Sequence, residues 1–370
     1  MQAAVVGAGI TGVTTAYYLA KAGYEVTIYD ERKYPAMATS YANGGQLSAS
    51  NAEVWNSWRS VAKGIKWLTK KDAPLRVNPW PSWDKYSWFY KFIREIPNAD
   101  ANTQATCEMA LSAHHLYKQI ADEEGIQFDK VEKGILHIYT NEREFENARR
   151  VNEVYARAGL KRWEVSAKEC LEIEPALVPP PKLLGGMYND TDFTGDIHKF
   201  CIELEKVLEN KYGVKYVNRK IRDLNKDLRE HRGPVVVCAG VESPALAKTV
   251  GDKLPIYPVK GYSITIHNPG IAPWTSMLDD EAKIVTARLG EDRLRIAGTA
   301  EFNGYNKDIV HARIKPLIEW AERMFPGINT ENVTPWAGLR PMMPNMMPVV
   351  NKSPNNRRIY YNTGHGHLGW

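Results

Sequence analysis

A glycine-rich run near the start of the chain has the spacing of a phosphate-binding turn. It reads Gly7-Ala8-Gly9-Ile10-Thr11-Gly12. The run lies between an apolar strand pattern and an apolar-periodic helix pattern, and a second strand pattern ends at Asp30. In such a unit the first glycine makes a tight turn, the second lets the backbone approach a pyrophosphate, and the third allows close helix packing. The phosphates lie at the helix N-terminus, and the following acid accepts hydrogen bonds from ribose hydroxyls. The predicted dinucleotide-binding residues are Val6, Gly7, Ala8, Gly9, Ile10, Thr11, Gly12, Asp30 and Glu31.

The composition describes an ordinary globular chain. Its 370 residues, 44% hydrophobic and 25% charged, exclude a disordered or coiled-coil protein and suffice for two domains. The net charge of +5 comes from well-mixed residues, so it does not indicate nucleic acid as a partner. The four cysteines show no metal-ligand or disulfide spacing, which predicts no metal site and a reducing, cytoplasmic compartment. The uncharged first twenty residues lack the basic start of a signal peptide, and a strand-turn-helix explains them better.

Four further motifs accompany the glycine run. They are residues 38–48 (ATSYANGGQLS), 258–263 (PVKGYS), 336–341 (WAGLRP) and 362–366 (NTGHG). In this order and at these distances they closely resemble the FAD-dependent D-amino acid oxidase superfamily, and within it the small subunits of bacterial D-amino acid dehydrogenases. The resemblance runs from residue 1 to residue 370. The position of the glycine run at the N-terminus also favours FAD over NAD, although its spacing alone does not decide between them.

The resemblance implies an enzyme that oxidises D-amino acids such as D-alanine. Hydride passes from Cα to flavin N5, and hydrolysis of the imino acid yields a 2-oxo acid and ammonium. A quinone or another acceptor of the respiratory chain takes the electrons. Relatives that oxidise glycine, sarcosine or hydroxyproline share nearly all these motifs and stay open as alternatives. From another class, a non-catalytic flavoprotein subunit of an electron-transfer complex stays open too.

The resemblance also assigns roles to single residues. Arg340 would pair with the substrate carboxylate, as guanidinium geometry favours; the alternative is a surface salt bridge. Lys260 and Tyr262 would lie near the flavin and the substrate. Strand alternation places both on one face, with Gly261 on the other, although an edge strand with an outward lysine would give the same pattern. The further cofactor-binding residues that it implies are Thr39, Ser40, Asn43, Gly44, Gly45, Gln46, Ala239, Gly240, Gly364, His365 and Gly366.

Aromatic and basic residues are concentrated between residues 55 and 92. Six of the 11 tryptophans fall there, interleaved with lysine and arginine. This composition is typical of a membrane interface, where tryptophan lies at headgroup depth and basic residues attract anionic lipid. We therefore predict peripheral contact with the inner face of the plasma membrane, with packing in the domain core as the alternative for about half of these tryptophans.

The element pattern predicts an α/β FAD-binding Rossmann-like domain plus an α+β substrate domain with a mixed sheet. The FAD-binding domain is expected at 1–50, 186–250 and 335–370, and the substrate domain at 51–185 and 251–334. In the resembling family the run after His365 continues into a glycine-led helix, so the resemblance implies a fragment that lacks this helix and binds FAD weakly. After Arg340 the family's turn glycine is replaced by methionine, which leaves substrate preference open.

Overall fold

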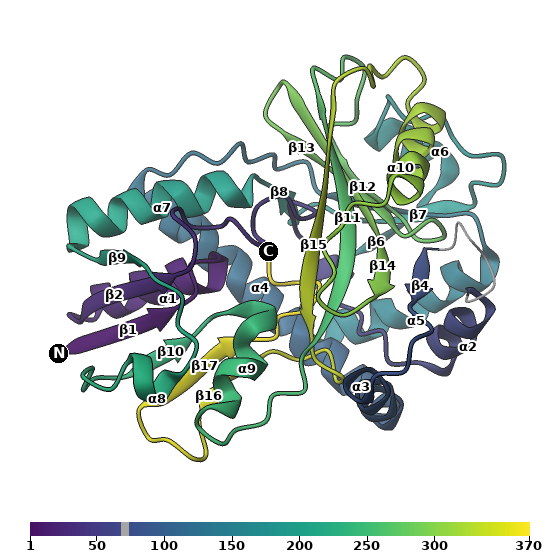
Figure 1. Ribbon diagram of the computed structural model, residues 1–370. Helices are drawn as coiled ribbons and strands as arrows, with labels where there is room; N and C mark the ends of the chain where they lie inside the picture. Colours follow the sequence, from purple (N-terminus) through teal and green to yellow (C-terminus); the bar gives the residue numbers. More distant parts are fainter. Residues whose placement is uncertain (68–73) are drawn as a thin grey trace.

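The computed structural model describes residues 1–67 and 74–370 and contains two large sheets, the smaller at the left and the larger at the right of Figure 1, and a short β3–β8 pair. The smaller sheet is parallel except at its β16 edge. Its strands, in spatial order, are β16 (Val349–Lys352), β17 (Ile359–Thr363), β10 (Val235–Val237), β1 (Gln2–Val6), β2 (Glu25–Asp30) and β9 (Lys215–Asn218).

Helices cover both faces of this sheet, which is why its central strand reads as a continuous apolar run. Four of the five residues of β1 are buried. On one face, α1 (Ile10–Lys21) and α7 (Ile197–Tyr212) pack together with the end of α4 (Ala99–Glu124). On the other face lie the short helices α8 (Leu224–Asp227) and α9 (Ser243–Lys248), and the 3-10 turn η3 (Gly240–Glu242) directly precedes α9. The carboxyl ends of β1, β10 and β17 therefore meet at one edge.

The larger sheet is mixed. Its strands follow the order β15 (Val333–Met342), β11 (Tyr257–His267), β14 (Arg293–Phe302), β13 (Ile284–Leu289), β12 (Ser276–Asp279), β5 (Ile135–Tyr139), β7 (Gly185–Asn189) and β6 (Trp163–Ser166), with β4 (Leu75–Val77) paired to β14. The β12–β5 and β14–β4 pairs are parallel. Helices α10 (His311–Met324) and α6 (Ala167–Ile173) pack on one face of this sheet. The two sheets confirm the predicted α/β and α+β parts.

The remaining elements connect the two sheets or border the space between them. They are β3 (Gln46–Leu47), β8 (Phe193–Thr194), α2 (Trp58–Trp67), α3 (Trp83–Arg94), α5 (Glu142–Arg157), η1 (Ala49–Asn51) and η2 (Ile96–Asn98). β15 crosses the domain boundary expected at residue 335 and pairs along its length with β11 of the larger sheet. The predicted division of the chain stays a prediction.

Candidate functional site

A cavity of about 1450 Å³ lies between the two sheets. At one end it is lined by the carboxyl edge of the smaller sheet, including Gly7 and Asp30. At the other end it is lined by β11, β14 and β15 of the larger sheet, including Arg340. One cavity thus joins the predicted dinucleotide turn to the predicted carboxylate-binding residue.

The glycine turn has room for a ligand only because its glycines lack side chains. Gly7 has a φ of 103°, and a Cβ there would lie 2.6 Å from the Cys238 carbonyl oxygen. A Cβ on Gly12 would overlap the Gly7 carbonyl oxygen. A Cβ on Gly9, by contrast, would meet only the Ser40 Oγ at 3.4 Å. The first and third glycines are therefore required by packing, and the space before the second is open for a phosphate at the start of α1.

The two acids at the carboxyl end of β2, Asp30 and Glu31, have different surroundings. Asp30 accepts hydrogen bonds from the backbone N–H groups of Ala8 and Arg32, both at 2.8 Å, so its carboxylate braces the glycine turn. Each carboxylate oxygen retains a further acceptor site, which a ribose hydroxyl could use. Glu31 pairs with Lys220 at 2.6 Å, and this hydrogen bond lowers the pKa of its carboxyl. Both acids line the cavity.

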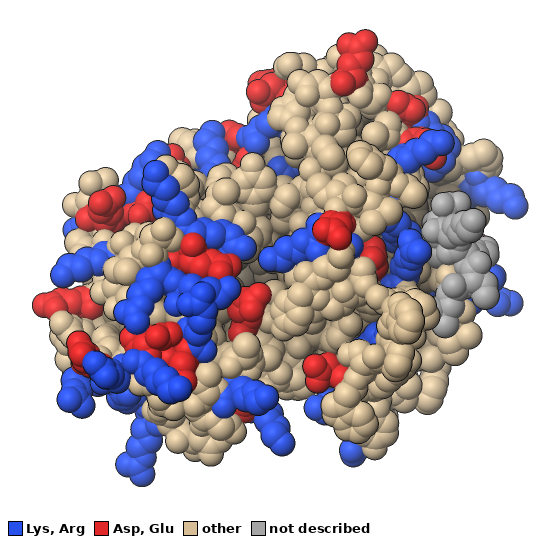
Figure 2. Space-filling view, viewed as in Figure 1, with Lys and Arg blue, Asp and Glu red and all other residues tan. Residues whose placement is uncertain are grey.

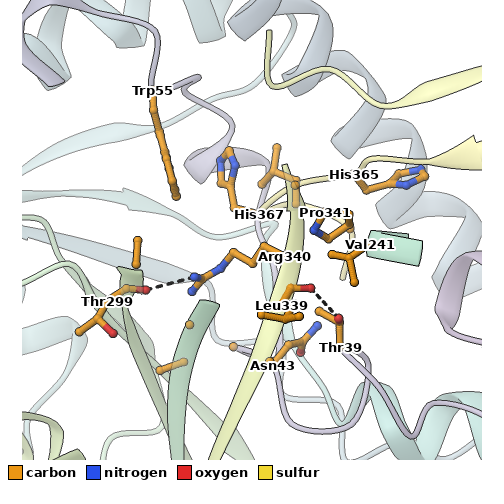
Figure 3. A pocket seen from close by; sticks show the side chains of 18 of the residues that line it. Thr39, Asn43, Trp55, Val241, Thr299, Leu339, Arg340, Pro341, His365 and His367 are labelled. Carbon is orange, nitrogen blue, oxygen red and sulfur yellow. Dashed lines mark hydrogen bonds between the residues drawn. The ribbon is translucent and has the colours of Figure 1, made fainter. Parts of the chain in front are cut away.

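The predicted polar loop at residues 39–46 links the glycine turn to the strand that carries Arg340. Ser40 Oγ accepts from the Ile10 N–H at 3.2 Å, and Thr39 Oγ1 donates to the Leu339 carbonyl at 2.7 Å (Figure 3). Farther on, Asn43 Oδ1 accepts from the Gly45 N–H at 3.1 Å. All six predicted residues of this loop line the cavity. Their polar groups thus fix the loop and leave its surface to a ligand.

The backbone turns after β10 and β17 complete this part of the lining. Gly240, Gly364 and Gly366 have φ values of 53°, 78° and 61°, which glycine adopts without strain. Thr363 Oγ1 donates to the Gly240 carbonyl at 3.3 Å and so ties the two turns together. Ala239 and His365 also line the cavity, and burial lowers the pKa of His365 to about 4.

Arg340 extends from β15 into the cavity and lies over Gly261 of the neighbouring strand (Figure 3). Its Nη1 donates to the Thr299 carbonyl oxygen at 3.1 Å, and no carboxylate in the described part of the chain forms an ion pair with it. Burial lowers the pKa of this guanidinium to about 10. A half-buried cation without an anionic partner has lost part of its hydration, which is costly. The site therefore favours a ligand with a carboxylate.

Lys260 and Tyr262 share one face of β11, opposite Gly261, as the alternation predicts. Lys260 is fully buried, 3.4 Å from the Glu301 carboxylate and 2.8 Å from Asn306 Oδ1, and it does not line the cavity. Tyr262 contributes to the lining, and its hydroxyl donates to Glu301 at 2.9 Å. Burial raises the pKa of Tyr262. The structure thus separates the lysine from Arg340 and holds it in a buried ion pair.

The motifs did not identify three residues that border the space around Arg340. Thr299 supplies the carbonyl partner of Arg340 at a strand irregularity and has a φ of 64°, unusual for a β-branched residue. The Trp55 ring lies near the His367 ring, with centroids 5.2 Å apart and planes tilted by 30°. His367 Nε2 lies 3.1 Å from the Asn51 carbonyl oxygen. Only a positive φ and contacts between distant segments mark these residues, and a sequence pattern does not show either.

No cluster of three metal-ligating side chains occurs within residues 1–67 and 74–370. The four cysteines are free and buried. Burial raises the pKa of Cys238 to about 12, so this thiol beside the glycine turn stays protonated at neutral pH. The cavity offers backbone donors, carboxylates and the Arg340 guanidinium, which suits a dinucleotide and an anionic substrate.

The comparisons with known proteins cover nearly the whole chain. A family described as "FAD dependent oxidoreductase" matches residues 2–370. "D-amino acid dehydrogenase 3" of Mesorhizobium japonicum is 52% identical, over 99% of this chain and 92% of the relative. "D-amino acid dehydrogenase" of Paramagnetospirillum magneticum is 41% identical, over 100% of this chain and 92% of the relative.

Two solved structures share the fold. Glycine oxidase from Geobacillus kaustophilus superposes with a TM-score of 0.76 at 21% identity, over 99% of this chain and 90% of that one. L-proline dehydrogenase from P. horikoshii superposes with a TM-score of 0.71 at 16% identity, over 100% and 88% of the two chains.

Proposed function

The chain belongs to the family of FAD-dependent oxidoreductases, and we propose that it oxidises D-amino acids to 2-oxo acids and ammonium. The observation that carries the proposal is Arg340, a half-buried guanidinium with a carbonyl partner and no anionic one among the described residues, in the same cavity as the dinucleotide turn. Curated relatives at 52% and 41% identity are named as D-amino acid dehydrogenases, which supports this substrate class.

The residues present fit FAD. The open space before Gly9 and the N-terminus of α1 would take the pyrophosphate, Asp30 the ribose, and the turns at Gly240 and Gly364 the flavin end. When bound, FAD supplies the acceptor for the hydride from Cα. The predicted cofactor-binding residues, all of which line the cavity except Gly12, keep that role as part of the proposal.

Arg340 provides the orientation that the reaction needs. A guanidinium binds a carboxylate through two parallel hydrogen bonds and so fixes the direction of the Cα substituents. Gly261 leaves room for the guanidinium, and the Thr299 carbonyl holds it in place. Apolar lining residues such as Trp55 and Leu339 keep water from the reacting atoms. Tyr262 and Lys260 would contribute indirectly, by holding β11 and β14 together through Glu301.

The test is an anaerobic titration of the FAD-loaded protein with D-alanine, followed by a panel of D- and L-amino acids, glycine, sarcosine and hydroxyproline. We expect D-alanine to bleach the flavin absorbance and its L-enantiomer to leave it unchanged. Arg340→Leu should keep FAD and lose most of this bleaching. Bleaching by glycine or sarcosine alone would assign the substrate to the alternatives, and no bleaching by any compound would indicate a non-catalytic flavoprotein.

We further propose that the electrons pass to a membrane quinone and that the α2–α3 surface contacts the bilayer. Within residues 1–67 and 74–370 no helix is both long and apolar enough to span a membrane. Trp88 is buried, but Trp58, Trp80 and Trp83 are 65%, 77% and 83% exposed, so half of the predicted aromatic cluster faces solvent. In Figure 2 the area over α3 is mostly uncharged, with both basic and acidic residues at its edges. Lys70 and Lys71, two of the basic residues interleaved with the tryptophans between residues 55 and 92, lie outside the described residues.

Sedimentation with anionic vesicles at low and high salt tests this surface. We expect the wild type to sediment at low salt and a Trp80→Ser/Trp83→Ser variant to stay in the supernatant. Trp163, which is 44% exposed on β6 in the larger sheet, offers a matched control in Trp163→Ser. Equal sedimentation of both variants would contradict the proposed contact.

A further inference from the structure

His367 borders the space around Arg340, and the binding of cofactor and carboxylate leaves it without a role. Its ring lies near Trp55, and Figure 3 draws both rings close to the Arg340 side chain. All three residues line the same cavity. A ligand whose carboxylate is bound by Arg340 therefore extends into space that His367 helps to enclose.

The hydrogen bond to Asn51 fixes the tautomer of the imidazole. A carbonyl oxygen can only accept, so His367 Nε2, 3.1 Å away, carries the hydrogen. In the neutral ring Nδ1 is then an acceptor with a free lone pair. Burial lowers the pKa of His367 to about 4, with a smaller contribution from the positive charge of Arg340, so the ring is neutral at pH 7. No group in the described ranges donates to Nδ1.

We propose that Nδ1 of His367 accepts the proton of the substrate's α-ammonium group. The inference rests on the proposed function, because it requires an amino acid as the substrate. Hydride can leave Cα only when the nitrogen lone pair is free to form the C=N bond. An ammonium N–H bond therefore breaks, its electron pair stays on nitrogen, and an Nδ1–H bond forms. The lone pair would then form the C=N bond as the Cα–H bond breaks, and FAD, when bound, would supply the acceptor for the hydride.

Substrate binding itself makes His367 a stronger base. The charged group that faces the ring is Arg340 on β15, and its field opposes protonation of the imidazole. A bound carboxylate compensates that field and raises the affinity of Nδ1 for a proton. In the segment at residues 51–55 the His367 ring contacts two neutral groups, the Asn51 carbonyl and the Trp55 indole. Glu53 of the same segment also lines the cavity, and burial raises the pKa of its carboxyl. His365, two residues earlier, is neutral at pH 7.

The pH dependence of kcat/KM for D-alanine distinguishes a proton acceptor from a packing residue. The wild type should be nearly independent of pH between about 6 and 9, because the bound substrate gives its proton to His367. His367→Gln must take the rare neutral amine from solution, so its kcat/KM should be low at pH 7 and rise about tenfold per pH unit. The matched control is His267→Gln, whose ring bonds to Thr334 outside the cavity. A His367→Gln profile parallel to that of the wild type would overturn the proposal.

A second measurement uses ligands that cannot react. 2-Methylalanine has no hydrogen on Cα, and 2-methylpropanoate has the same carboxylate without the amine; both are titrated into the FAD-loaded protein by flavin absorbance. The wild type should bind the amino acid more tightly, and His367→Gln should lose roughly tenfold of that advantage while binding 2-methylpropanoate unchanged. If the affinities for both fall together, His367 has only a structural role. His367→Asn repeats the comparison if the first variant does not fold.

The two proposals fail in different ways. If the wild type oxidises no amino acid at any pH, the proposed function is wrong, whatever the variants do. If it oxidises D-alanine and His367→Gln keeps both the wild-type pH profile and the preference for 2-methylalanine, the function stands and the role of His367 is refuted.

Discussion

Replacing Gly261 by alanine tests whether Arg340 occupies the position that the structure gives it. A Cβ at residue 261 would lie 2.5 Å from Cζ and 2.6 Å from Nη2 of Arg340, well inside van der Waals contact, and would also overlap Nη1. The obstructing atoms are the far end of a flexible side chain. The clash is therefore relieved by moving the guanidinium away from the Thr299 carbonyl, and the backbone of β11 can stay in place.

The expected loss follows from the hydrogen bonds that the displaced guanidinium can no longer make. Each charge-assisted hydrogen bond to a carboxylate contributes about 1.5 to 3 kcal/mol. Misalignment of one of the two costs about 2 kcal/mol, which corresponds to about a 30-fold lower kcat/KM for D-alanine. The loss should appear mainly as a higher KM and as a weaker affinity for 2-methylpropanoate. FAD content and the melting temperature should stay near those of the wild type.

A double-mutant cycle with Arg340→Leu provides the control. If Gly261→Ala acts only by displacing Arg340, it should have almost no further effect in the Arg340→Leu background. An equal loss in both backgrounds would mean that the alanine distorts the site in another way. Unchanged kinetics of the single variant would place the guanidinium elsewhere and refute the assignment of the carboxylate site.

Two further changes separate structural from catalytic roles. Lys260→Met leaves the buried Glu301 carboxylate without the Lys260 ammonium. Urea unfolding should therefore show a free energy of unfolding lower by about 3 kcal/mol, while KM for D-alanine is unchanged. Lost turnover at full stability would instead make Lys260 catalytic. Burial raises the pKa of Asp192 from 3.8 to about 6, so the native state retains a proton that the unfolded chain releases. The free energy of unfolding should therefore fall by up to about 3 kcal/mol as the pH rises from about 4 to 6. Asp192→Asn should remove this pH dependence. An unchanged pH dependence in the variant would contradict the assignment to Asp192.

Local patterns predicted the parts of the site that depend on neighbouring residues. The glycine spacing and its distance to Asp30 follow from the short connections between each strand and the next helix. In the structure the glycine turn and Asp30 are in contact, because the Ala8 N–H donates to the Asp30 carboxylate. Alternation along β11 likewise placed Gly261 opposite Lys260, because side chains of a strand point to alternate faces.

Glycine spacing and strand alternation could not predict contacts between segments that lie far apart in the sequence. Thr299 faces Arg340 because the register of β14 against β11 shifts between Lys260 and Tyr262. His367 meets the Asn51 carbonyl across 316 positions of sequence. Lys260 is a further example of a contact between distant segments. Alternation predicted which face of β11 carries it, but only its contacts with Glu301 and Asn306 show that it lies outside the cavity.

The uncompensated charge of Arg340 links substrate recognition to the proposed chemistry. The half-buried Arg340 guanidinium has a carbonyl partner but no anionic partner among the described residues, and its field helps to keep His367 neutral. A substrate carboxylate offsets the cost of that half-buried charge and, by the same contact, makes Nδ1 a better proton acceptor. An amine without a carboxylate would gain neither effect, and a carboxylate without an amine would gain the first only. The arrangement therefore selects for both groups on one carbon, because either one alone leaves a half-buried polar group unpaired.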